Sequence, residues 1–89
     1  MRTIKSQDGK MIVNAEKANR FCIDKPEEEY EENFCLWRIF VIFDVWTKIA
    51  EYSTEKRALR VLDMLNEWLT MQRTYSCFQM PKDSGELDA

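Results

Sequence analysis

The chain has 89 residues, enough for one domain that buries about 60–65% of its unfolded surface, which argues against a deep catalytic cleft. Hydrophobic residues make up 45% of the chain and charged residues 33%, so the composition predicts a packed core and excludes global disorder. The formal charge of −3 is unevenly distributed, because residues 24–33 contain six acids and a single lysine. No apolar run approaches the roughly 20 residues that span a bilayer, and no signal-peptide core is present. We therefore expect a cytoplasmic protein that makes no membrane contact.

The first part of the chain has the pattern of three strands. Residues 2–6 and 10–14 flank Asp8-Gly9, a pair that readily adopts the positive φ angles of a tight hairpin turn. Residues 20–24 form a short apolar strand that ends before Pro26, which cannot donate a hydrogen bond to a ladder. The acidic segment that follows is predicted to be a connection.

Residues 34–45 are the longest β-like run and are predicted to be the central strand. Odd-numbered positions from Cys35 to Val45 are all apolar, so this face is expected to meet the helix. The even-numbered face is also largely apolar and is expected to need a cover. Its members are Phe34, Leu36, Arg38, Phe40, Ile42 and Asp44.

A further strand at 47–52 runs into a helix at about 54–72, with Ser53 or Thr54 as its N-cap. The helix has an apolar stripe at helical spacing, formed by Ala58, Val61, Leu62, Leu65 and Leu69. Residues 75–80 are predicted to form the last strand. The expected fold is α+β, with one small antiparallel sheet of about five to six strands and the helix packed on one face. Residues 1–81 are expected to be a single domain and residues 82–89 a disordered tail.

The residue types argue against an enzyme. The chain has no histidine, which removes the commonest general base and the partner of a Ser-His or Cys-His nucleophile. It has only two glycines, too few for a phosphate-binding loop or a dinucleotide fingerprint. The lysines and arginines are scattered, so we expect no direct binding of nucleic acid.

Three cysteines raise the alternative of a structural zinc ion. Cys22 and Cys35 flank the acidic connection, Cys77 lies on another predicted strand, and Asp24 is a candidate oxygen ligand. No Cys-x-x-Cys spacing supports the site, and buried reduced cysteines are the competing interpretation. Zinc would make this chain a small metal-stabilised structural or regulatory domain.

The acidic segment is the candidate surface for a partner. Its carboxylates present spaced negative charge, much as a phosphate backbone does, and so suit a basic groove. The alternative is a connection that only keeps the protein soluble. The candidate partner-binding residues are Asp24, Glu27, Glu28, Glu29, Glu31 and Glu32.

Three stretches carry a resemblance to a family: Ser6-Gln-Asp-Gly9, Ile49-Ala-Glu-Tyr-Ser-Thr-Glu-Lys-Arg-Ala-Leu-Arg-Val-Leu62, and Phe78-Gln-Met-Pro81. The chain resembles small proteins of Gram-positive phages, prophages and integrative elements, most of which have no assigned activity. It also looks like an anti-CRISPR protein, a class of small phage proteins that block type II RNA-guided nucleases. The resemblance implies a non-enzymatic inhibitor that acts in the host bacterial cytosol.

If that resemblance holds, the partner is a type II CRISPR nuclease and the inhibited step is target-DNA loading, guide loading or the activating rearrangement. DNA loading is favoured because the DNA channel of such a nuclease is basic and the segment from Asp24 to Glu32 is acidic. Monomeric and homodimeric states are both compatible with the sequence. A dimer interface is one way to cover the even-numbered face of residues 34–45.

Overall fold

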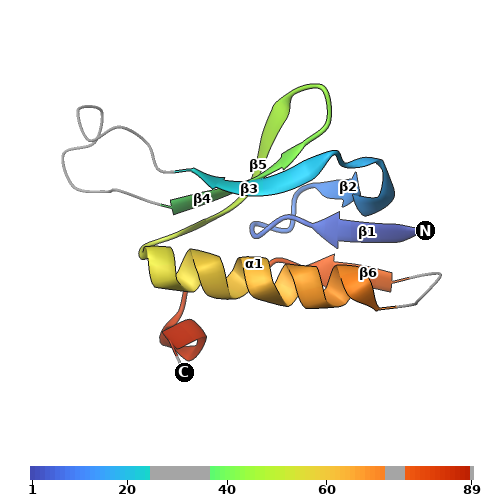
Figure 1. The fold of residues 1–89 in the computed structure, drawn as a ribbon. Coiled ribbons are helices and arrows are strands. Elements are labelled where there is room, and N and C mark those ends of the chain that lie inside the picture. The colour runs from blue at the N-terminus through green and yellow to red at the C-terminus, as the bar shows by residue number, and fades with distance from the viewer. Residues whose placement is uncertain (25–36, 72–75, 89) are drawn as a thin grey trace.

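The computed structural model describes residues 1–24, 37–71 and 76–88. These residues form strands, one long helix and two short 3-10 helices in an α+β fold (Figure 1). In chain order the elements are β1 (Arg2–Lys5), β2 (Ile12–Asn14), η1 (Ala15–Lys17), β3 (Arg20–Asp24), β4 (Trp37–Ile42), β5 (Trp46–Tyr52), α1 (Glu55–Thr70), β6 (Ser76–Gln79) and η3 (Gly85–Asp88).

The described strands form two three-stranded sheets, so the expectation of one antiparallel sheet was wrong. The first sheet has the order β2-β1-β6 and the second has the order β3-β4-β5. β6 pairs with β1 in parallel, whereas the other pairs are antiparallel. The physical reason is that α1 carries the chain back across the molecule, so the last strand arrives beside the first instead of extending the second sheet.

The N-terminal hairpin forms around the predicted turn. Gly9 has a φ of +75°, the left-handed conformation that glycine adopts without strain. The Ser6 hydroxyl donates a hydrogen bond of 2.6 Å to the Asp8 carboxylate. This bond, followed by one from the Lys10 amide, lowers the pKa of Asp8. The turn is therefore held by its own polar side chains.

The helix α1 begins as the sequence predicts. The Thr54 side chain accepts a hydrogen bond from the Arg57 amide at 3.2 Å and caps the helix. Ala58, Val61 and Leu65 are buried against the sheets. Trp68, outside the predicted stripe, is also buried, and its indole N–H donates to the Ser76 hydroxyl on β6. The helix thus contributes side chains to one core cluster shared with strands of both sheets.

The strand β4 is central in the second sheet, as predicted, and its inner face carries the core. Ile39 and Val41 are fully buried, whereas Val45 beyond the strand is 67% exposed. The apolar odd-numbered face therefore meets the helix only as far as the bend at residues 43–45. Residues 34–36 of the predicted strand lie outside the described part of the chain.

The side chain of Gln7 joins the two sheets. Its amide oxygen accepts from the Glu51 N–H at 3.1 Å, and its amide nitrogen donates to the Glu51 carbonyl at 3.0 Å. The Gln7 main-chain N–H donates to the Ile49 carbonyl at 2.8 Å. The same amide nitrogen also reaches the Pro81 carbonyl, which accepts the Tyr52 hydroxyl at 2.7 Å. Gln7 therefore occupies the edge of β5 in the manner of a short paired strand.

The segment after Pro81 is packed on the helix, in contrast to the predicted disordered tail. The Arg57 guanidinium contacts Asp83 at 3.0 Å and Asp88 at 2.9 Å. Leu87 on η3 is buried and belongs to the core cluster. The polar composition of this segment gave no sign of this attachment. Asp83 and Asp88 both bind Arg57, and the single leucine packs into the core.

Candidate protein-interaction face

The outer face is the side of the second sheet that points away from α1, and cross-strand register defines its members. Three rows run from β3 through β4 to β5. They are Arg20, Ile42 and Trp46; Cys22, Phe40 and Lys48; and Asp24, Arg38 and Glu51. Figure 1 shows α1 and the first sheet on the opposite side of this sheet. No described element lies over the outer face, although Ile42 within it is buried beneath its neighbours.

Two aromatic rings and a guanidinium lie together on this face. The rings of Phe40 and Trp46 meet edge to face with centroids 5.5 Å apart. The Arg38 guanidinium lies 6.0 Å from the Phe40 ring centroid, within the range of a cation–π contact. Trp46 keeps 54% of its surface exposed. The result is an exposed aromatic surface next to a cation.

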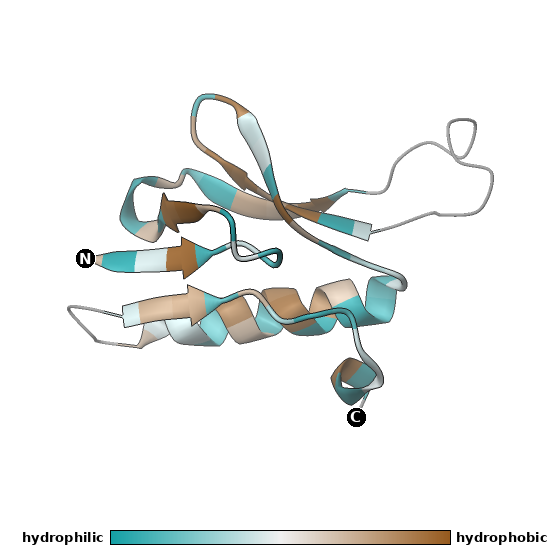
Figure 2. Cartoon of the chain, turned by 180° about the vertical axis from the view of Figure 1, so that it is seen from behind, coloured by the Kyte–Doolittle hydropathy of each residue, from teal (hydrophilic) through white to brown (hydrophobic). Residues whose placement is uncertain are grey.

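The bend between β4 and β5 extends the apolar surface. Val45 precedes Trp46 and is 67% exposed. Figure 2 shows hydrophobic residues along the β4–β5 hairpin, which rises away from the helix. Val45 and Trp46 thus place two consecutive large side chains in solvent at one margin of the face.

Arg38 is the electrostatic feature of the face. Its Nε atom is buried, and it has no hydrogen-bond partner among the residues that the structure describes. Asp24 lies opposite Arg38 in the strand register but is exposed. On β5, Lys48 and Glu51 form an exposed ion pair at 3.3 Å. The face thus combines aromatic surface with a positively charged group that has spare donor capacity.

The predicted acidic surface begins at the border of this face. Asp24 is the first acid of the segment and the last residue of β3, where it lies opposite Arg38. The other predicted partner-binding residues, Glu27, Glu28, Glu29, Glu31 and Glu32, lie outside the described residues. Their position as part of a binding surface stays a prediction.

The predicted zinc ligands are only partly placed. Cys22 is half-buried on β3 of the second sheet, and Cys77 is exposed on β6 of the first sheet. Among the described residues there is no group of three or more cysteine, aspartate or glutamate side chains that could hold a metal. Cys35 lies outside them, so the set of Cys22, Cys35, Cys77 and Asp24 stays a prediction.

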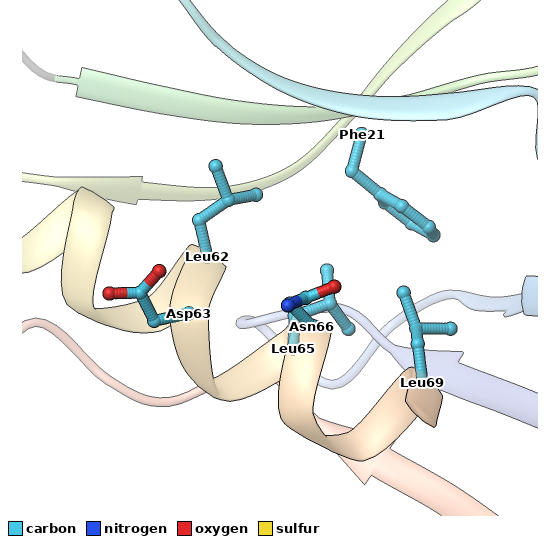
Figure 3. A pocket seen from close by; sticks show the side chains of 6 residues that line it. All are labelled: Phe21, Leu62, Asp63, Leu65, Asn66 and Leu69. Carbon is cyan, nitrogen blue, oxygen red and sulfur yellow. The ribbon is translucent and has the colours of Figure 1, made fainter. Parts of the chain in front are cut away.

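A groove lies between β3 and α1 on the inner side of the second sheet. It has a volume of about 310 Å³, and Figure 3 shows Phe21 projecting from β3 above Asn66 and Leu69 of the helix. Leu62, Asp63 and Leu65 complete its lining. Its polar side chains are the Asp63 carboxylate and the Asn66 amide.

The segments that carry the family resemblance meet at the Gln7 junction rather than on the outer face. The Gln79 amide donates to the Ser6 carbonyl at 3.0 Å, and Ser53 binds Asp83 through its N–H and its hydroxyl, both at 3.2 Å. Burial, with a further contribution from the charge of Asp83, raises the pKa of Tyr52 above its usual range. These hydrogen bonds join segments that lie far apart in the chain.

Comparison with known proteins adds no relative. No family model matches the chain, and neither the curated proteins nor the solved structures contain a significant match. In the residues that the structure describes, no helix has the length and apolar character needed to cross a membrane.

The sequence singled out one side of β4 but not Trp46. The nearly unbroken apolar character of the even-numbered positions predicted that this side of β4 needs a cover. Trp46 was missed because it lies beyond the bend, where the alternation of β4 no longer applies. Trp46 could be assigned to this face only from its position opposite Ile42, which the register of the hairpin shows.

Proposed function

We propose that this chain is a phage-encoded, non-enzymatic inhibitor of the anti-CRISPR type. It binds a type II RNA-guided nuclease through the outer face and the adjoining acidic segment, and it blocks the loading of target DNA. The observation that carries the proposal is the half-exposed Trp46, packed on Phe40 beside Arg38.

The composition of the outer face supports a protein partner. Tryptophan and arginine are enriched among the residues that contribute most to protein–protein binding, and such residues cluster at the centre of a contact. Burial of Trp46 and Val45 would remove apolar surface from water. A carboxylate or carbonyl of the partner would satisfy the Arg38 guanidinium.

Charge supports the choice of a nucleic-acid-processing partner. Asp24 ends β3 and five glutamates follow it as far as Glu32, and the DNA channel of an RNA-guided nuclease is lined with basic residues. An acidic segment would compete there with the phosphate backbone for the same cations. The resemblance of Ser6–Gly9, Ile49–Leu62 and Phe78–Pro81 to phage proteins adds support for this class of partner.

The test is a cleavage assay with purified type II nucleases, guide RNA and target DNA, in which the protein is added before or after the DNA. We expect inhibition only when the protein comes first, at a stoichiometry near one chain per nuclease. Inhibition that does not depend on the order of addition would contradict a block at DNA loading. A lack of both binding and inhibition across a panel of nucleases would overturn the proposal.

Matched variants connect the assay to the surface. Trp46→Ala should weaken nuclease binding by more than tenfold, a typical loss for an aromatic residue that contributes strongly to binding. Leu59→Ala is the control, because Leu59 is similarly exposed, at 48%, but lies on α1 away from the outer face. Conversion of Glu27, Glu28, Glu29, Glu31 and Glu32 to lysine should abolish inhibition. The control Glu67→Lys, on the exposed side of α1, should not.

A further inference from the structure

The two edges of the second sheet differ in how their backbone groups are used. On the β5 edge, Gln7 forms hydrogen bonds with the Ile49 carbonyl and with both main-chain groups of Glu51. The Asp83 carboxylate accepts a hydrogen bond from the Ser53 N–H. On the β3 edge, no strand of the described chain pairs with the side that faces away from β4. An unpaired edge strand is a template for pairing with another chain.

The sequence of β3 has opposite charges at its two ends. Arg20 and Asp24 are both exposed, Cys22 lies midway between them, and the half-buried Phe21 and Ile23 occupy the positions between. In an antiparallel pair of two identical strands, the start of one strand meets the end of the other. A strand that is positive at its start and negative at its end therefore complements itself.

We propose that the protein forms a two-fold homodimer in which β3 of one copy pairs antiparallel with β3 of a second copy, centred on Cys22. The two second sheets then join into one six-stranded sheet. Each Arg20 lies opposite Asp24 of the second copy, and each Phe21 lies opposite its Ile23.

Other pairings of β3 lack this match. A parallel pair brings Arg20 next to Arg20 and Asp24 next to Asp24, so like charges face each other. An antiparallel pair shifted by two residues places Arg20 or Asp24 opposite Cys22 and loses both charge pairs. In an antiparallel pair shifted by one residue, Phe21 and Ile23 would lie on the face of the joined sheet opposite to the Phe21 and Ile23 of the second copy.

The groove below β3 provides a site for the apolar side chains of the second copy. Phe21 forms one wall, and Leu62 and Leu69 of α1 lie opposite it (Figure 3). In the joined sheet, Phe21 and Ile23 of the second copy would lie on the same inner face as those of the first. They would pack at the mouth of this groove. The outer faces of the two copies would likewise become continuous.

Dimerisation is tested on the protein alone by light scattering after size-exclusion chromatography over a dilution series. We expect a dimer that dissociates on dilution. The single variants Arg20→Asp and Asp24→Arg each place like charges at both ends of the pair, and each should raise the dissociation constant about tenfold or more. The double variant with both substitutions restores opposite charges and should restore the dimer.

The charge-exchange series also gives the contradicting result. Failure of the double variant to recover dimers, with circular dichroism showing all four proteins folded, would overturn the proposed register. A wild-type protein that is monomeric at every concentration would overturn the dimer itself. These outcomes do not depend on the nuclease, so they are distinct from failure of the proposed function.

The central thiols provide a second test. Directly opposed residues in an antiparallel pair have Cα atoms about 4.5–5.5 Å apart, within the range of a disulfide. A variant with Cys35→Ser and Cys77→Ser keeps only Cys22. Oxidised glutathione should convert its two opposed thiols into one intermolecular disulfide, with release of two molecules of reduced glutathione.

The matched control keeps only Cys77, which is exposed on β6, and carries Cys22→Ser and Cys35→Ser. At equal concentration the Cys22 variant should form covalent dimers several times faster than the Cys77 variant. Equal rates would show that the thiols meet only by random collision and would contradict pairing at Cys22.

Discussion

The two edges of the second sheet show how one protein can stabilise one side of a sheet and leave the other for association. At the β5 edge, a glutamine side chain from the N-terminal turn pairs with the strand, and the C-terminal segment closes the end. At the β3 edge, exposed residues of opposite charge flank half-buried apolar ones. Substitutions at the β5 edge should therefore change stability, whereas those at the β3 edge and on the outer face should change association.

The largest expected effect on stability is that of Gln7→Ala. This change leaves the Glu51 N–H and carbonyl without their partners in a part-buried position, and we expect a loss of about 1–3 kcal/mol in the free energy of unfolding. Urea denaturation followed by circular dichroism measures it. Arg20→Ala on the β3 edge is the control and should change the monomer's stability by less than about 0.5 kcal/mol. Equal losses for the two variants would remove the distinction between the edges.

Tyr52→Phe tests the next contact of the same junction. The variant loses the hydrogen bond to the Pro81 carbonyl, and we expect a destabilisation of about 1 kcal/mol. Because the folded-state pKa of Tyr52 is raised, its hydroxyl contributes fully below the unfolded-state value of about 10. The wild-type protein should lose this contribution as the pH rises above 10, and Tyr52→Phe should show a smaller loss. Parallel pH profiles for the two proteins would contradict this account.

Arg57→Gln should release the C-terminal segment with a smaller effect on the whole domain. Arg57 holds Asp83 and Asp88, and without it the packing of Leu87 remains the chief attachment of η3. We expect faster digestion of residues 82–89 by carboxypeptidase, with little change in the digestion of the core. Lys56→Gln is the control, because Lys56 occupies the preceding, exposed position of α1.

The same segment should respond to acid. Burial favours the neutral form of Asp83, but hydrogen bonds from Arg57 and Ser53 outweigh it and lower its pKa; hydrogen bonds from Arg57 also lower the pKa of Asp88. Carboxylates with lowered folded-state pKa values stabilise above their ordinary value near 3.8 and lose that contribution as the pH falls further. Digestion of the wild-type segment by an acid-active carboxypeptidase should therefore accelerate below pH 4, and digestion of Arg57→Gln should change less.

Trp46→Ala should change the stability of the fold only slightly. Trp46 is half-exposed and packs on one ring, so we expect a loss of at most about 1 kcal/mol. Thermal unfolding measures this change, while the binding assay described above measures the large loss of affinity expected of the same variant. A large destabilisation with unchanged affinity would place Trp46 in the fold rather than in the interaction face.

Local elements could be predicted because short-range chemistry decides them. Asp8-Gly9 supplies the turn, Thr54 supplies the helix cap, and the spacing of Ala58, Val61 and Leu65 gives α1 its buried side. Each signal acts within a few residues, where propensity and hydrogen bonding suffice. The central position of β4 in its sheet followed from its apolar length.

The tertiary structure decided which of these elements meet. The division into two sheets, the parallel pairing of β6 with β1, the amide of Gln7 on the edge of β5 and the attachment of Asp83 and Asp88 to Arg57 all join segments far apart in the chain. Trp46 became part of a candidate face only through its register with Ile42 and its contact with Phe40. The sequence by itself thus determined the turn, the cap and the apolar stripe, whereas long-range packing and hydrogen bonding selected the sheet order and the surface left open.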